Sequence, residues 1–239
     1  MGQQIERVRT YVQNFDEVLQ GGIPKGQVVL ITGTPGTMKS SLSYSILYQN
    51  ALQNKTKSVY MTLEQSRENL LQQMYAMGMD KEEVKEYVHI LDLGLIRKSL
   101  TQLSAKGTWL QVFKMYAESL KHSLNYELLV VDSLDVLEMA AQVGDNRRTE
   151  LFFLFEWLRN MGITTLLLSE TSPDKMFENK YDEGYLADGV ISLKLHELGE
   201  TDIQRRIRAV KLRSTNHKTG YFSLLFSDGV FRATQVITE

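Results

Sequence analysis

The chain has 239 residues, 43% of them hydrophobic and 23% charged, and a formal net charge of −2. These values predict a globular protein with one domain over residues 1–239, without a broad attraction to nucleic acid or anionic membranes. The absence of cysteine excludes disulfides, thiol catalysis and Cys-ligated zinc. The N-terminus lacks the apolar core of a signal peptide, and no apolar run reaches the roughly 20 residues of a membrane span. We therefore expect a soluble, cytoplasmic protein.

Strands and helices alternate along the first two thirds of the chain, and a β-rich region follows. In chain order we predict a strand at 27–32, a helix at 39–53, a strand at 58–63, helices at 66–77 and 80–83, a strand at 88–93, a helix at 108–124, a strand at 127–132, a helix at 148–161, a strand at 163–169, and antiparallel strands at 190–195, 203–212, 220–226 and 230–231. Ser66 and Asp80 are predicted helix N-caps. This order predicts an α/β fold, a mostly parallel sheet flanked by helices with a C-terminal antiparallel extension.

The segment after the first predicted strand reads GTPGTMKS over residues 33–40. It is close to the Walker A phosphate-binding loop, G-x-x-x-x-G-K-[ST], whose lysine reaches the β and γ phosphates and whose hydroxyl holds Mg²⁺. Lys39 and Ser40 have the required spacing from Gly33, whereas Met38 occupies the position of the second glycine. A strand before the loop and a helical pattern after it favour a nucleotide site over a glycine-rich turn without a ligand.

Three acidic residues stand where predicted parallel strands end, the edge at which open α/β sheets bind ligands. Asp132 closes the apolar run Leu-Leu-Val-Val, the Walker B pattern, in which a carboxylate helps to hold Mg²⁺. Glu64 is a candidate base that takes a proton from the water attacking the γ-phosphate. Glu170 either senses the phosphate or binds water, or it is an ordinary loop carboxylate.

Two cations, Lys211 and Arg213, alternate along a later predicted strand and therefore share one of its faces. Their spacing alone fits the solvated face of an edge strand. The apolar neighbours Ala209, Val210 and Leu212 instead suggest a partly buried strand, where paired cations are costly.

Three segments together resemble the KaiC-like proteins of the RecA superfamily, in its KaiC/RadA branch. They are Phe15–Gly26 before the loop, Leu186–Ile191, and Lys211–His217. The likeness runs from about residue 10 to residue 233. It implies a RecA-like P-loop fold and a ring, often a homohexamer, that binds ATP and Mg²⁺ between neighbouring subunits.

The resemblance also assigns roles to individual residues. It implies that Ser40 and Asp132 serve Mg²⁺, that Glu64 activates water, and that Lys211 and Arg213 reach the γ-phosphate held by the next subunit, as an arginine finger does. The residues it places around the nucleotide are Gly33, Thr34, Pro35, Gly36, Thr37, Met38, Lys39, Ser40 and Ser41 of the loop, together with Thr215, His217 and Asp228 across the interface.

The chain departs from the family pattern at three positions in or next to this predicted site. Met38 replaces a glycine, Gln65 replaces the second residue of a Glu-Glu pair, and Ser214 replaces another glycine. A side chain at position 38 costs about 1–2 kcal/mol if the backbone there has a positive φ. The departures bear on turnover more than on binding. The resemblance also bears on phosphorylation, because the circadian clock protein of this family is phosphorylated on a Ser and a Thr. Gly184 and Tyr185 align with those two positions, so autophosphorylation at Ser or Thr is not expected here.

Three functions remain open. The first is a KaiC-like ATPase that acts as a regulatory or signalling ring with slow hydrolysis and an unidentified protein partner. The second is a DNA recombinase or recombination mediator of the RadA branch. Nucleic acid is not an expected partner, because the candidate DNA loop, residues 171–189, carries five acidic and two basic residues, a net charge of −3. The third is a nucleotide-binding module with little turnover, suggested by Met38 and Gln65.

Overall fold

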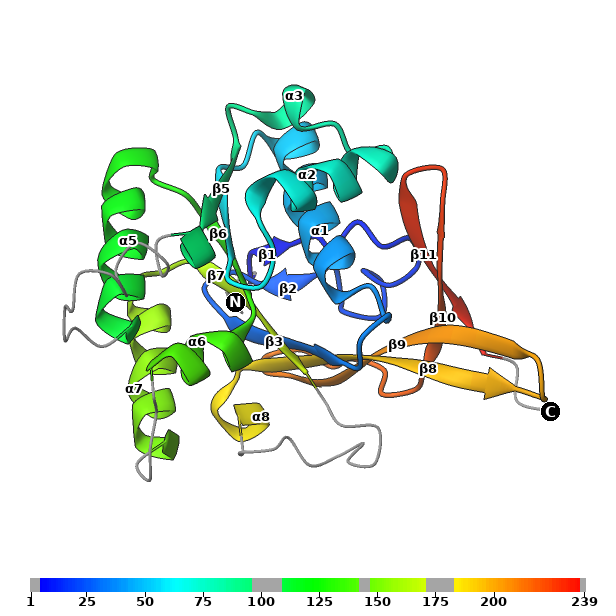
Figure 1. Ribbon diagram of the computed structural model, residues 1–239. Coiled ribbons are helices and arrows are strands. Elements are labelled where there is room, and N and C mark those ends of the chain that lie inside the picture. Colours follow the sequence, from blue (N-terminus) through cyan, green and yellow to red (C-terminus); the bar gives the residue numbers. More distant parts are fainter. Residues whose placement is uncertain (1–4, 96–108, 142–146, 171–182, 237–239) are drawn as a thin grey trace.

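The computed structural model describes residues 5–95, 109–141, 147–170 and 183–236. A nine-stranded sheet forms its centre, in the order β11-β10-β9-β8-β3-β7-β6-β4-β5 (Figure 1). Its strands are β3 (Val28–Gly33), β4 (Ser58–Thr62), β5 (Val88–Asp92), β6 (Leu128–Asp132), β7 (Thr164–Glu170), β8 (Gly189–Leu198), β9 (Asp202–Leu212), β10 (Phe222–Ser227) and β11 (Val230–Gln235). The strands from β8 to β5 pair in parallel, and β9, β10 and β11 add an antiparallel end. The predicted mixed sheet is confirmed.

Helices cover both faces of the parallel part, which explains why its strands are apolar without alternation. One face packs against α1 (Lys39–Asn54), α2 (Arg67–Ala76) and α3 (Lys81–Val84). The other packs against α5 (Trp109–Leu124), α6 (Leu134–Ala141) and α7 (Arg147–Asn160). Successive residues of one strand enter opposite cores, as Val29 and Leu30 of β3 do. Among the described residues, none of these helices has both the length and the apolar character needed to cross a membrane.

Both predicted N-caps are present. The Ser66 hydroxyl accepts a hydrogen bond from the Asn69 N–H at 3.2 Å, and the Asp80 carboxylate accepts one from the Glu82 N–H at 2.9 Å. Three features were not predicted: α6, the single turn α8 (Glu183–Leu186), and a small sheet of β1 (Arg7–Val8) and β2 (Ile23–Pro24). Strand β8 also extends to Leu198, beyond the expected end at residue 195. These elements are too short or too irregular for a periodic pattern to mark them.

Strand β9 is not an edge strand, because it pairs with β8 on one side and β10 on the other. The pairing with β10 includes only Arg206 and Ile207, so it does not cover Lys211, near the end of β9, or Arg213, which follows the strand.

Candidate functional site

The phosphate-binding loop connects the buried strand β3 to the long helix α1, as predicted. Gly33 is required by close packing, since a Cβ atom there would lie 2.6 Å from the Leu193 carbonyl oxygen and 2.8 Å from Thr37 Oγ1. Gly36 has a φ of +82°, which favours glycine. The Thr37 hydroxyl donates to the Thr34 carbonyl at 2.7 Å and closes the loop. The sequence thus forms a compact turn in front of the α1 N-terminus, a place suited to anions.

Met38 has the left-handed backbone that the missing glycine would favour, with a φ of 71°. Its side chain is half-buried and packs against the core beside α1. Ser214, the second replacement of a glycine, also has a positive φ, 58°. At both positions the chain therefore has a left-handed backbone that carries a side chain, where a glycine would relieve the strain.

The ammonium group of Lys39 lies over the start of the loop and donates to the carbonyl oxygens of Gly33 at 2.7 Å and Thr34 at 3.2 Å. Burial lowers the pKa of Lys39, while nearby carboxylates oppose this shift by favouring the charged ammonium. These carboxylates are Glu170, Asp132, Glu64 and Asp135. The predicted strand-end acids therefore do converge on the loop lysine.

Asp132 is 3% exposed, and Tyr60 donates a hydrogen bond to its Oδ2 at 2.5 Å. Burial raises the pKa of Asp132, and the neighbouring hydroxyl groups of Tyr60 and Ser40 oppose that rise. Within the described part of the chain, no three His, Cys, Asp or Glu side chains form a metal cluster. One carboxylate and one hydroxyl nevertheless fit Mg²⁺, which usually keeps waters and substrate phosphates as its other ligands.

Glu64 lies near Asp132 because β4 and β6 are paired, with Thr62 opposite Asp132. Its carboxylate is exposed and accepts a hydrogen bond from the Ser133 hydroxyl. The Asp132–Ser133 peptide bond is cis. An exposed, oriented carboxylate beside the loop is free to accept a proton from water. Gln65, next to it, accepts a hydrogen bond from the Thr62 hydroxyl through its backbone carbonyl.

Glu170 ends β7 directly opposite Gly33 in the parallel register. Its backbone N–H donates to Asp135 Oδ2 at 2.8 Å, and its side chain is exposed. This register explains why an acid from a distant part of the sequence lies at the first residue of the loop.

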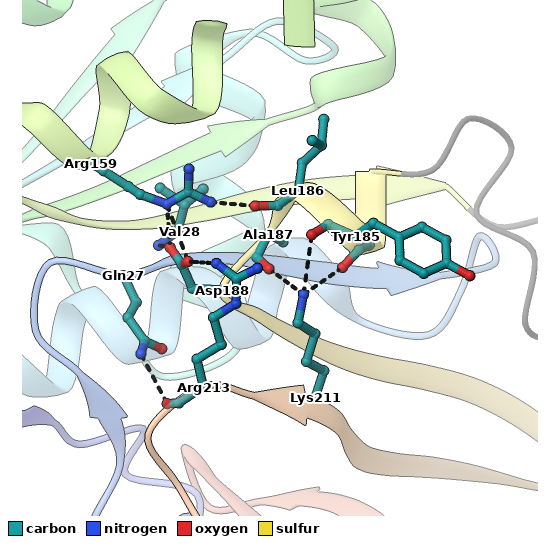
Figure 2. A network of polar contacts seen from close by, with 10 residues as sticks. Gln27, Val28, Arg159, Tyr185, Leu186, Ala187, Asp188, Lys211 and Arg213 are labelled. Carbon is teal, nitrogen blue, oxygen red and sulfur yellow. Dashed lines mark hydrogen bonds and ion pairs between the residues drawn. The ribbon is translucent and has the colours of Figure 1, made fainter. Parts of the chain in front are cut away.

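Lys211 and Arg213 lie away from the loop of their own chain, near the beginning of β3 (Figure 2). Lys211 Nζ donates to three carbonyl oxygens around the end of α8, those of Gly184 at 3.1 Å, Tyr185 at 3.3 Å and Ala187 at 2.7 Å. Arg213 Nη1 donates to Asp188 Oδ1 at 2.9 Å. Burial and the neighbouring Arg213 lower the pKa of Lys211. Both cations are therefore anchored to the segment that contains α8.

The three other predicted nucleotide contacts are split between two places. Thr215 and His217 follow β9, and the Thr215 hydroxyl accepts a hydrogen bond from Arg7 Nη1 at 2.8 Å. Asp228 is exposed in the turn between β10 and β11, at the other end of β10, with a φ of 53°. The structure does not bring Asp228 together with Thr215 and His217.

Several residues of the site have no motif in the sequence. Tyr60 lies inside an apolar strand, and the position of Ser133 depends on strand pairing. Arg205, on β9, donates its Nε–H to the Gly36 carbonyl at 3.1 Å and so contacts the loop of its own chain. The side chain of its neighbour Arg206 lies on the opposite face of the strand. Only the register of the β8–β9 hairpin shows which of the two arginines faces the loop.

The fold and this arrangement define a RecA-type P-loop nucleotide-binding protein. A profile of the KaiC ATPase family matches residues 8–230. The chain therefore belongs to the KaiC family of ATP-binding ATPases.

The similar proteins agree with this assignment. A circadian clock oscillator protein KaiC of Rippkaea orientalis is 26% identical over 95% of this chain, which spans only 44% of that protein. A UPF0273 protein of Aeropyrum pernix is 27% identical over 89% of this chain and 87% of its own length. The crystal structure of a KaiC-like protein from Pyrococcus horikoshii OT3 superposes with a TM-score of 0.82 at 26% identity, covering 97% of this chain and all of the other.

Proposed function

We propose that the chain binds Mg·ATP at the loop of residues 33–41 and hydrolyses it slowly, in a homohexameric ring whose neighbouring subunits complete each other's sites. We assign it a regulatory or signalling role, by analogy with the clock proteins among its relatives. The single observation that carries the proposal is the position of the candidate cations Lys211 and Arg213. Their hydrogen-bond partners lie beside the first residue of β3, whereas the loop of the same chain follows its last residue.

Binding is supported by the groups around the loop. Lys39 supplies a positive charge at its mouth, and Ser40 and Asp132 together offer the oxygen ligands that Mg²⁺ prefers. Magnesium, when bound, would neutralise charge on the phosphates. The chain's own residues then orient the reactants: Tyr60 holds Asp132, and Ser133 holds Glu64 as the base.

Sharing of the site is supported by distances along the sheet. Asp188, the partner of Arg213, accepts a hydrogen bond from the Val28 N–H at the first residue of β3, whereas the loop follows the last residue, Gly33. Five residue steps along a parallel strand correspond to roughly 16 Å. A monomer thus separates Arg213 from its own phosphates, and a cation from a neighbouring subunit would fill the gap.

Slow turnover is supported by two departures from the family pattern. Met38 has a strained backbone next to the phosphate-binding lysine, Lys39, and the chain has Gln65 in place of a second carboxylate next to Glu64. If these departures abolished hydrolysis altogether, the chain would be a nucleotide-binding module, which is the second candidate function.

Binding is tested by calorimetry with Mg·ATP. We expect Lys39→Ala to abolish binding, because the lysine provides the charge at the loop, and Lys57→Ala, an exposed lysine before β4, to leave affinity unchanged. Unaltered affinity in Lys39→Ala would remove the nucleotide assignment. Glu64→Gln should retain the affinity and lower kcat, because it changes proton transfer and not phosphate contacts.

Assembly is tested by sedimentation and by subunit mixing. Mg·ATP should shift the wild type toward larger species, most of them hexamers, because ATP binds the assembled state better. Mixed rings of Arg213→Ala and Glu64→Gln chains should be more active than either variant alone, since some interfaces then contain both intact halves. A monomer with full activity, or mixed rings without a gain, would exclude the shared site.

A further inference from the structure

Asp188 is the centre of the polar network that surrounds the two candidate cations (Figure 2). It is 6% exposed and lies two residues after the end of α8. Its carboxylate accepts hydrogen bonds from the Val28 N–H at 3.0 Å, from Arg159 Nε at 2.9 Å and from Arg213 Nη1 at 2.9 Å. A buried carboxylate with this many donors is held in a single orientation.

The backbone of Asp188 is fixed as firmly as its side chain. Its N–H donates to the Val28 carbonyl at 2.8 Å, and its carbonyl accepts from the Arg213 N–H at 2.8 Å. Asp188 therefore joins the start of β3 to the end of β9, and it contacts Arg213 through both backbone and side chain. The sheet itself determines where this carboxylate lies.

The two arginines bound to Asp188 differ in what else they contact. Arg159, on α7, also donates to the Leu186 carbonyl and is 31% exposed. Arg213 is held through Nη1, and 53% of its side chain is exposed. Gln27 donates to the Arg213 carbonyl at 3.0 Å and fixes the base of the same residue. Arg159 thus helps to hold the Asp188 carboxylate in place, whereas Arg213 has a guanidinium-bearing side chain that is largely exposed.

We propose that Asp188 is a positioning residue for ATP hydrolysis: it fixes one nitrogen of Arg213, so that the remaining guanidinium N–H groups face the nucleotide of the neighbouring subunit. This proposal rests on the proposed function, the ring with shared sites. An arginine has five donors in a rigid plane, so fixing one of them orients the others. A pre-oriented cation stabilises the transition state without first losing side-chain freedom.

The substitution Asp188→Asn tests the proposal, because the amide keeps one acceptor and removes the charge that attracts Arg213. We expect kcat to fall about tenfold, less than the loss in Arg213→Ala, with KM changed less than about twofold. The matched control is Asp16→Asn, the same substitution at another buried carboxylate, which accepts hydrogen bonds from Arg9 Nε and from the Thr10 N–H and lies outside the network of Figure 2. It should keep the wild-type kcat.

Subunit mixing separates positioning from a merely structural role. Asp188→Asn chains mixed with Glu64→Gln chains should regain activity, because the Glu64→Gln chains supply a positioned Arg213 to intact loops. Mixed with Arg213→Ala chains they should regain none, because every interface then lacks a positioned arginine. Recovery with Arg213→Ala chains would overturn the proposal, because it would show that Asp188 acts on its own loop through β3.

Two other outcomes, a variant that does not fold and a ring without shared sites, can be distinguished from failure of the positioning role. If Asp188→Asn does not fold by circular dichroism, the double variant Asp188→Asn/Arg159→Gln removes the opposing charge and enters the same mixing tests. If Arg213→Ala hydrolyses ATP in a single turnover as fast as the wild type, the shared site itself is wrong. If Arg213→Ala lowers it and Asp188→Asn matches the wild type, only the positioning role is wrong.

Discussion

Tyr60 donates its hydroxyl hydrogen to Oδ2 of Asp132 inside the sheet, joining β4 to β6 directly below the phosphate-binding loop. Burial raises the pKa of Tyr60 well above its usual range, so the hydroxyl stays protonated and remains a donor at physiological pH. The carboxylate beside the loop is thereby kept in one orientation.

Substitution of Tyr60 by phenylalanine leaves this buried carboxylate with one donor fewer. We expect the free energy of unfolding to fall by about 1–3 kcal/mol and the Mg²⁺ concentration required for half-maximal ATP binding to change. Denaturant unfolding and calorimetry at several Mg²⁺ concentrations measure the two effects. Tyr126→Phe is the control, because that buried hydroxyl donates to the Ala117 carbonyl and should affect stability alone. An unchanged Mg²⁺ requirement in Tyr60→Phe would contradict the role of the pair.

Ser214→Gly should stabilise the protein by up to about 1 kcal/mol, because it relieves a left-handed backbone at an exposed residue. Met38→Gly relieves the same kind of strain but loses the packing of a half-buried side chain, so its net effect should be smaller or unfavourable. Thermal unfolding compares the two. A larger gain for Met38→Gly than for Ser214→Gly would show that the Met38 side chain adds nothing to the core.

Arg205→Met should weaken Mg·ATP binding about tenfold, the effect of losing one charge-assisted hydrogen bond at the loop. Arg206→Met is the matched control, because the adjacent arginine points to the other sheet face and donates to Gln204 Oε1 at 2.9 Å. Its affinity should equal that of the wild type. Equal effects of the two substitutions would indicate only a general loss of positive charge.

Glu138 should make the stability of the protein depend on pH. Burial raises its pKa to about 7, against the opposing effect of Arg147 and with a smaller contribution from Glu183 and Asp135. A carboxyl with a raised folded-state pKa favours folding below its ordinary value of 4.5, and this contribution is lost as the pH rises to about 7. The melting temperature of the wild type relative to Glu138→Gln should therefore fall between pH 5 and pH 8. Glu82→Gln, at an exposed position on α3, should show no such trend.

The sequence predicted those parts of the site that lie in one contiguous segment. The loop of residues 33–40 and the apolar run before Asp132 have spacings set by local backbone geometry, so they are visible without a structure. Tyr60 is not, because an aromatic residue in a buried strand resembles any other core residue until β4 is paired with β6. Arg205 and Asp188 are invisible for the same reason, since their partners lie 169 and 25 residues away.

The α8 turn shows a different limit. Its four residues are fewer than the pattern of an amphipathic helix requires. Its end is held by Lys211 of β9, which is distant in the sequence. Residues 171–182, which include most of the candidate DNA loop, lie outside the described residues, so the sequence-based argument against DNA binding stays a prediction.

Lys211 has three N–H groups and donates to three carbonyl oxygens of its own chain. Any phosphate that recruits this ammonium must compete with those oxygens, so the gain from the new contact is reduced by the bonds given up. This competition favours reversible binding of a phosphate by the Lys211 ammonium over permanent binding. In the proposed ring, two subunits that met through Lys211 would therefore be able to separate again when the phosphate leaves, because the lysine has intramolecular acceptors to return to.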